Sequence, residues 1–214
     1  MADLQTERTT LHRLPERGSH DRAAIDAILD EAIVCHLGFV DAGQPYVIPT
    51  VYARVGDVIY LHGSAASRTL RAVRGAIPVC LTVTLLDGLV LARSAFHHSV
   101  NYRSVVLLGT ASGVEDPEEK TAALHAIVEH TVPGRSTDAR ASNDKERRAT
   151  IVLKLAITEA SAKIRAGGPK DDPEDMARQI WAGVIPLRTV AGDPVREPDC
   201  DVAAPAYVAA YLRP

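Results

Sequence analysis

A chain of 214 residues with 46% hydrophobic residues can bury a core as one domain, and its mean hydropathy of −0.01 is typical of a globular protein. A net charge of −3 gives no broad attraction for nucleic acid or anionic membrane, so neither is an expected partner. Asp3, Glu7 and Arg8 stand where a signal peptide would be apolar, and no apolar run reaches the ~18 residues of a membrane span. These features predict a cytoplasmic protein.

Local patterns predict an amphipathic helix over residues 21–33 and then a strand from Val34 to Val40. Two further strands, Tyr46–Tyr52 and Val58–His62, flank a hairpin turn at 54–57. Pro49 lacks a backbone donor, which predicts that its strand is an edge or carries a bulge at this point.

The rest of the chain alternates short antiparallel strands with helical insertions. A helix is predicted to begin at Asp116-Pro117 and to run to Thr131. Asp87-Gly88 predicts a two-residue hairpin turn between two strands. The expected later strands are 78–86, 89–94, 102–114, 151–164 and 181–187. The pattern predicts a mainly β protein with α-helical insertions.

The cysteines and adjacent histidines give no metal signature. Cys35, Cys80 and Cys200 are odd in number and far apart, which argues against a disulfide framework and a zinc ribbon. His97 and His98 are adjacent, so on a strand their rings point in opposite directions and cannot chelate one ion. We therefore expect no structural metal site.

The segment after the second hairpin strand has the composition of a phosphate site. Gly63 and the small residues Ser64 to Ser67 lead from a strand to Arg68 at an expected helix start. Backbone N–H groups, hydroxyls and a guanidinium together suit a dianion. A serine-rich helix cap is the alternative interpretation of the same residues.

Several motifs occur in an order that is found in one known family. They are Arg17-Gly18-Ser19, His62-Gly63-Ser64, Leu86-Asp87-Gly88, Phe96 to Ser104, and Trp181-Ala182-Gly183. Together with the run from Tyr46 to Val83, they resemble the pyridoxamine 5'-phosphate oxidase-like flavoproteins. The likeness is greatest to predicted flavin-nucleotide-binding proteins related to nitroimidazole-resistance proteins. The resemblance implies an FMN-binding split β-barrel in a single domain 1–214, with its core over about 20–190 and a C-terminal tail at 192–214.

The resemblance also implies a set of FMN contacts, carried over position by position. The residues expected to lie along the flavin ring, the ribityl chain and the phosphate are Ile48, Pro49, Thr50, Val51, His62, Gly63, Ser64, Ser67 and Arg68. The further contacts are Arg103, Ser104, Lys163 and, from across a dimer, Trp181. Thr69 stands where the oxidases have a lysine, so one phosphate cation is missing unless Lys163 or Arg71 replaces it.

The function that this resemblance implies is an FMN-dependent oxidoreductase acting as a homodimer with the flavin at the interface. Hydride or electron transfer at flavin N5 would serve a small-molecule substrate and an electron donor, as in a nitroreductase or flavin reductase. His62 is the candidate catalytic residue. Val184 to Leu187 replace the basic residues of the vitamin B6 oxidases, which argues against that activity. Three alternatives remain open: haem binding on the same barrel, a deazaflavin cofactor, and a non-catalytic flavin-binding module.

Overall fold

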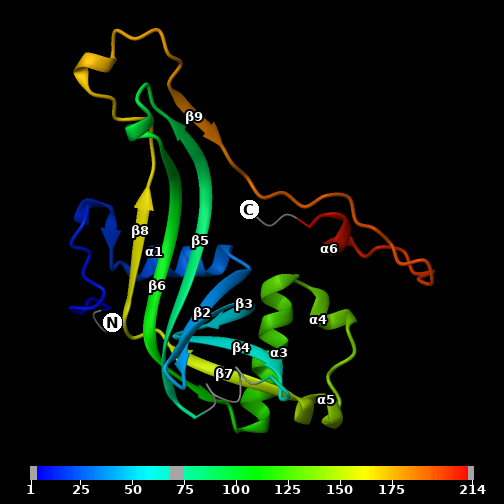
Figure 1. The fold of residues 1–214 in the computed structure, drawn as a ribbon. Coiled ribbons are helices and arrows are strands. Elements are labelled where there is room, and N and C mark those ends of the chain that lie inside the picture. Colours follow the sequence, from blue (N-terminus) through cyan, green and yellow to red (C-terminus); the bar gives the residue numbers. More distant parts are fainter. Residues whose placement is uncertain (1–3, 68–74, 212–214) are drawn as a thin grey trace.

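A computed structural model describes residues 4–67 and 75–211. Within these residues nine strands form one sheet in the order β1-β8-β6-β7-β4-β3-β2-β5-β9, and β5 also pairs with β6. That additional pairing closes the strands from β6 through β7, β4, β3 and β2 to β5 into a barrel (Figure 1). The mainly β fold with helical insertions is confirmed.

All the pairings between strands are antiparallel. The strands are β1 (Gly18–Ser19), β2 (Val34–Asp41), β3 (Gln44–Val55), β4 (Val58–Ser64), β5 (Ile77–Leu91), β6 (Ser99–Gly113), β7 (Thr150–Ala156), β8 (Ala160–Arg165) and β9 (Gly183–Pro186). The helices are α1 (Arg22–Glu31), α3 (Pro117–Thr131), α4 (Arg135–Asp138), α5 (Asp144–Ala149) and α6 (Ala206–Ala209), with short 3-10 turns at Pro15–Arg17, Ala95–His97 and Pro173–Asp175.

The core lies inside the barrel and under α1. Ile25, Ile28 and Leu29 of α1 are buried against the sheet, as the predicted apolar face required. Alternate residues of the barrel strands point inward, and Leu61 and Leu155 are fully buried there. Asp21 caps α1 by accepting a hydrogen bond from the Ala24 N–H at 3.0 Å.

The predicted hairpin at Asp87-Gly88 is wrong, because β5 continues through it. β5 pairs with β6 from Ile77 to Val90, and the register shifts by one residue between Leu86 and Gly88. Asp87 is therefore a bulge residue. A long partner strand on one side outweighs a local turn preference, since it supplies ladder hydrogen bonds on both sides of the bulge.

The single strand predicted over 151–164 is also wrong, since the structure has two strands there. β7 ends at Ala156 and β8 begins at Ala160. Between them the Ile157 N–H donates to the Asp57 carbonyl at 2.8 Å, and Glu159 is hydrogen-bonded to Arg8 and Thr6. Contacts from remote segments therefore turn the chain at this point.

Figure 1 shows that β5, β6 and β8 extend well beyond the barrel and that β9 joins β5 at their far end. We call this part the extended end; it comprises β5 from Thr84, β6 up to Ser104, and residues 166–186. From there the chain runs out as an extended tail and returns through α6. Tyr211 ends this return, and its hydroxyl donates to the Thr131 carbonyl at 2.8 Å. The expected division into a core over about 20–190 and a C-terminal tail at 192–214 stays a prediction.

No helix in the described part of the chain is long and apolar enough to cross a membrane.

Candidate functional site

The barrel has an opening where β3 and β4 separate. Their pairing runs from Val55↔Val58 to Tyr52↔Leu61 and ends there. Beyond it, β3 pairs only with β2, and β4 pairs only with β7. Pro49 lies on this open stretch of β3, so the predicted edge position is confirmed.

A cavity of about 150 Å³ occupies this opening, and we call it the split pocket. Its lining consists of Leu37, Ile48, Pro49, Thr50, Leu61, His62, Gly63, Ser64 and Ser67. Seven of these nine are residues that the sequence analysis singled out from two strands and a loop. These seven predicted residues therefore meet at the opening that forms where β3 and β4 separate.

His62 is the least satisfied polar group of the split pocket. Its Nδ1 atom is buried and has no hydrogen-bond partner among the described residues. Burial lowers the pKa of His62 from its ordinary value, which favours the neutral imidazole near neutral pH. A neutral ring has one N–H donor and one free acceptor, so it can hydrogen-bond a ligand without adding charge.

A phosphate-binding loop leaves its backbone N–H groups free for the ligand, and the turn from Ser64 to Ser67 does not. The Ala65 N–H donates to the Ala149 carbonyl at 2.8 Å, and the Ser67 N–H donates to the Ser64 carbonyl at 2.9 Å. The Ala66 N–H donates to Ser64 Oγ at 3.1 Å. The expectation that these backbone N–H groups serve a ligand is therefore wrong for this conformation. The Ser67 hydroxyl remains as a donor at the rim.

Two other predicted contacts of this region are placed differently. Val51 is on β3 opposite Val34 of β2 and does not line the split pocket. Arg68, the predicted phosphate anchor, lies outside the described residues, as do Thr69 and Arg71. The arginine–phosphate contact stays a prediction.

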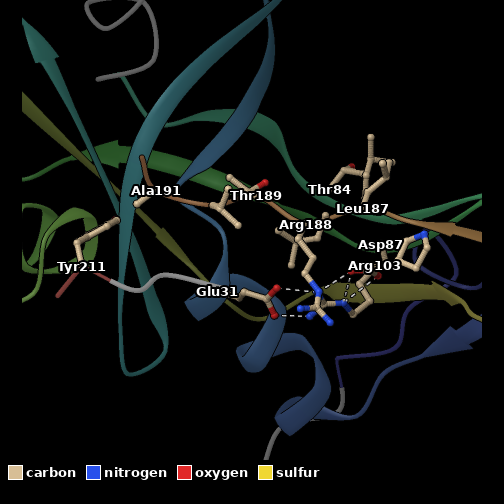
Figure 2. Close-up of a pocket in the computed structure, with 13 residues that line it drawn as sticks. Glu31, Thr84, Asp87, Arg103, Leu187, Arg188, Thr189, Ala191 and Tyr211 are labelled. Atoms are coloured by element: carbon tan, nitrogen blue, oxygen red, sulfur yellow. Dashed lines mark hydrogen bonds and ion pairs between the residues drawn. The ribbon is translucent and has the colours of Figure 1, made fainter. Parts of the chain in front are cut away.

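Arg103 and Ser104 do not act as one pair. Arg103 Nη2 lies 2.6 Å from Glu31 Oε1 and 2.8 Å from Asp87 Oδ1. Figure 2 shows the Arg103 side chain joined to both of these carboxylates. These two carboxylates raise the pKa of Arg103 above its ordinary value. Ser104 is on the opposite face of β6, because neighbouring residues of a strand alternate. The two residues therefore face different surroundings, and their expected contacts with a cofactor stay predictions.

Ser104 and Lys163 are neighbours across β6 and β8. Ser104 Oγ donates to the Lys163 carbonyl at 3.2 Å, and Lys163 Nζ donates to the Arg13 carbonyl at 3.3 Å. Neither residue lines the split pocket. Their proposed contact with a cofactor would have to be made away from this opening.

Trp181 comes two residues before β9, and Figure 1 shows β9 at the extended end, away from the barrel. Its side chain is 65% exposed, and its ring packs on Gly183, where an added Cβ would come within 2.8 Å of Cη2. Within one chain it does not line the split pocket. The predicted contact with a flavin therefore requires a second copy.

The adjacent histidines His97 and His98 each make a hydrogen bond within the extended end. His97 Nε2 lies 3.0 Å from Asp172 Oδ2, and His98 Nδ1 lies 3.0 Å from the Ser94 carbonyl oxygen. They hold the turn between β5 and β6 against the loop before β9. The two residues lie in and after the 3-10 turn Ala95–His97 and not on a strand, and the expectation that they bind no metal stays a prediction.

Leu37 and Leu61 line the split pocket although no sequence motif had marked them as site residues. Both are buried and alternate with less buried neighbours, which is the signal of a core position. Their part in the pocket depends on where β3 and β4 separate, and no local pattern gives that point.

The comparisons with known proteins agree with this architecture. The family model described as pyridoxamine 5'-phosphate oxidase matches residues 21–164. The chain belongs to this family. No curated protein is similar enough to match it.

Three solved structures of the family's fold illustrate the likeness. The flavocytochrome Anf3 from Azotobacter vinelandii is 41% identical, with 95% of each chain covered and a TM-score of 0.89. The FAD and heme binding protein from Mycobacterium smegmatis is 39% identical, covering 90% of this chain and 95% of its own, with a TM-score of 0.86. A putative 5-nitroimidazole antibiotic resistance protein from Bacteroides thetaiotaomicron is 27% identical, with 69% and 86% covered and a TM-score of 0.58. The predicted family and its split-barrel fold are thereby confirmed.

Proposed function

We propose that this protein binds a flavin nucleotide in the split pocket and acts in electron transfer. The observation that carries the proposal is the meeting of Thr50, His62, Ser64 and Ser67 at one opening, with a buried His62 Nδ1 that lacks a partner. The relatives at 41% and 39% identity are named as a flavocytochrome and as a protein that binds FAD and heme. Their names support a redox role over a vitamin B6 oxidase.

The donor set of the split pocket suits a flavin. The open stretch of β3 has backbone groups that β4 does not pair, and such groups can bind the polar edge of a flavin ring. The hydroxyls of Thr50, Ser64 and Ser67 suit a ribityl chain or its phosphate. The bound flavin would supply hydride or electron transfer, while His62 donates a hydrogen bond as a neutral imidazole.

We also propose that the protein is a homodimer. The face of β2, β3 and β5 turned away from the core, which we call the outer sheet face, exposes apolar side chains. Val34 is 44% exposed, Val40 59%, Val47 65% and Leu86 55%. The register places all four on the same face. A cavity of about 150 Å³ is below the ~300–1,000 Å³ of typical ligand pockets, so a partner wall would complete the site.

Haem binding is a second function that one observation favours. The rings of His20, His97, His98, His125 and His130 are all hydrogen-bonded. His12 and His36, by contrast, are exposed and have no hydrogen-bond partner among the described residues, and of these two His36 lies on the outer sheet face. A histidine with free ring nitrogens among apolar side chains is the donor that haem iron requires. We propose His36 as an axial haem ligand between two copies.

The cofactors test this function directly. The purified protein is expected to show flavin absorption, flavin fluorescence after denaturation, and a haem Soret band. His36→Ala should lose the Soret band and keep the flavin, whereas His98→Ala should keep both. A protein that takes up neither cofactor when supplied with both would refute the proposal.

Reduction of the bound flavin by NADH or NADPH, followed by a panel of nitro and quinone acceptors, separates an oxidoreductase from a flavin-binding module. Turnover with any acceptor establishes catalysis. A flavin that is reduced only by dithionite and passes no electrons on would indicate a binding module.

A further inference from the structure

One edge of β5 is unpaired over a short stretch between two neighbouring strands. β2 pairs with β5 as far as His36↔Thr82, and β9 pairs with it from Gly88 onward. Between these two pairings, no strand of the described residues lies beside this edge. Figure 1 shows β2 beside the barrel part of β5 and β9 at its far end. We call the space beside residues 83–87 of β5 the β5 slot.

The backbone groups of Thr84 and Leu86 point into the β5 slot. Along a strand these groups point alternately to the neighbour on either side. The Leu108 N–H donates to the Glu159 carbonyl at 2.9 Å, so the even-numbered residues of β6 face β8 and the odd-numbered ones face β5. The register below the bulge pairs odd-numbered residues of β6 with odd-numbered residues of β5. Thr84 and Leu86 therefore face the slot, and no described residue hydrogen-bonds their backbone there.

The slot admits a single extended segment. A cavity of about 1120 Å³ lies beside it, lined by Thr84 of β5 and by Leu187 to Ala191 of the tail, as Figure 2 shows. β2 and β9 flank the slot in the same sheet, so the edge of another folded sheet is blocked. An extended segment can add to such an edge, because its own N–H and C=O groups complete the ladder.

The charges around the slot favour a segment that carries both signs. Glu31 and Asp87 share Arg103, so this group has one excess negative charge. Arg188 also lines the cavity and has no hydrogen bond or ion pair with any residue that the structure describes. A fitting occupant therefore has a cation for the carboxylates and an anion for Arg188.

The C-terminal tail contains an extended segment with this composition. Residues 188–204, all of them described, make a single backbone hydrogen bond among themselves. Val195 is 95% exposed, and Arg196 and Glu197 have no side-chain partner in the described part of the chain. Pro194 and Pro198 lack a backbone N–H, which limits a ladder to the three residues between them. Three residues also separate the two pairings that bound the slot, from 84 to 86.

The register of such a pairing matches the side chains on both faces. If Val195 stands opposite Leu86 in an antiparallel pair, Glu197 stands opposite Thr84. Arg196 then projects to the other face, because side chains alternate along a strand. That is the face of Arg103, which carries the paired carboxylates of the preceding paragraph.

The tail of the same chain is directed away from its own slot. It runs outward from β9 and returns only through α6 (Figure 1). Its end is tied to the α3 side of the molecule, where the Tyr211 hydroxyl donates to the Thr131 carbonyl at 2.8 Å and Arg135 Nη1 donates to the Tyr207 hydroxyl at 3.1 Å. The proposed homodimer brings a second copy to the outer sheet face, and Leu86 belongs to both that face and the slot. The second copy's tail is therefore the segment that we assign to it.

We propose that residues 195–197 of each copy add as a short strand to Thr84–Leu86 of the other copy. The inference rests on the proposed homodimer and deepens it, because it names the segments that are exchanged. Twofold symmetry makes the exchange reciprocal, so both slots receive a strand and the assembly is closed.

Disulfide trapping tests the exchange on the full chain. A copy with Leu86→Cys is co-expressed with a differently tagged copy that has Val195→Cys, and Cys200→Ser in both removes the native thiol of the tail. Because each copy has only one of the two new cysteines, mild oxidation can join 86 to 195 only between copies. The covalent dimer, mapped by mass spectrometry, should form at least about fivefold more than with Val202→Cys, an exposed position of the same tail, in place of Val195→Cys.

Charge reversal is a second measurement that does not depend on cysteines. Arg188→Glu should weaken dimerisation about threefold to tenfold in sedimentation velocity, and adding Glu197→Arg should restore it. Glu118→Arg, on an exposed site of α3, is the control and should leave the dimer unchanged.

Three results would overturn the exchange. One is a dimer that shows no link between 86 and 195 above the control. Another is a single chain with both cysteines that closes the link within itself, since the tail would then fill its own slot. The third is a charge reversal that Glu197→Arg does not rescue. A protein that stays monomeric at all concentrations would instead refute the proposed homodimer, and the exchange with it.

Discussion

The barrel and the extended end are stabilised in different ways. In the barrel, large aliphatic side chains such as Leu61, Leu153 and Leu155 are fully buried by the same chain. At the extended end Leu86, Leu89 and Ile185 are 40–55% exposed, and Arg93 and Arg103 are paired with carboxylates. The interior of the barrel is therefore filled by one chain, whereas the extended end and the outer sheet face of the barrel both leave apolar side chains for other contacts.

Arginine side chains make ion pairs and hydrogen bonds at the extended end and beside it. Arg93 Nη1 lies 2.8 Å from Asp171 Oδ2, whose side chain is 2% exposed. Arg103 lies between Glu31 and Asp87, and Arg165 donates to Asn101 and to the Gly168 carbonyl. Such contacts fix geometry but contribute less net stability than apolar burial does. The comparison predicts that mutations in the two regions act on different properties.

The largest effect is expected in the barrel. Leu155→Ala should lower the free energy of unfolding by about 2–5 kcal/mol, because it opens a cavity in a fully buried core. Urea denaturation measures this value. Leu86→Ala, at a side chain that is 55% exposed, is the counterpart in the extended end and should cost less than about 1 kcal/mol in dilute monomer. Equal costs would abolish the distinction between the regions.

Association is expected to depend on the outer sheet face. Val47→Asp introduces a charge at a side chain that is 65% exposed, and it should weaken dimerisation at least about tenfold because burying the charge is costly. Sedimentation velocity at several concentrations measures this change. Ala122→Asp on exposed α3 is the control. An unchanged dimer would show that a different surface pairs.

Loss of the ion pairs that Arg103 makes with Glu31 and Asp87 is expected to lower the free energy of unfolding by a smaller amount. Arg103→Ala leaves two carboxylates without their cation, and the loss should be about 1 kcal/mol after allowance for solvent at a side chain that is 31% exposed. Arg140→Ala, in an exposed pair, should change unfolding little. Thermal unfolding of both variants makes the comparison.

The smallest effect is the pH dependence that arises from His62. Burial holds its folded-state pKa below the unfolded value of ~6.5, so the unfolded chain takes up the proton first as pH falls. Wild type therefore loses stability on acidification through this range, and His62→Gln lacks that contribution. Unfolding free energies from pH ~8 to pH ~5 measure the difference. A constant difference between the two proteins would mean that His62 is not desolvated in the fold.

Local signals predicted most elements of the barrel but failed where two segments compete. Asp21 and Asp116 cap the helices that they were expected to begin, and the 54–57 turn joins the expected strands. Asp87-Gly88 has the sequence of a hairpin turn, yet β6 pairs with the chain on both sides of it. The turn preference of two residues contributes little free energy, and the hydrogen bonds along the whole β5–β6 pairing outweigh it.

The sequence by itself determined the family, the strand-rich barrel and the residues that meet at the split pocket, because motif order and side-chain periodicity are properties of the chain. Only the tertiary structure decided where β3 and β4 separate and which face Arg103 occupies. The tertiary structure alone also decided that the backbone N–H groups of the turn after Gly63 donate hydrogen bonds to acceptors within the protein. These outcomes depend on register and on partners far along the chain, which pairing energies select and no local pattern encodes.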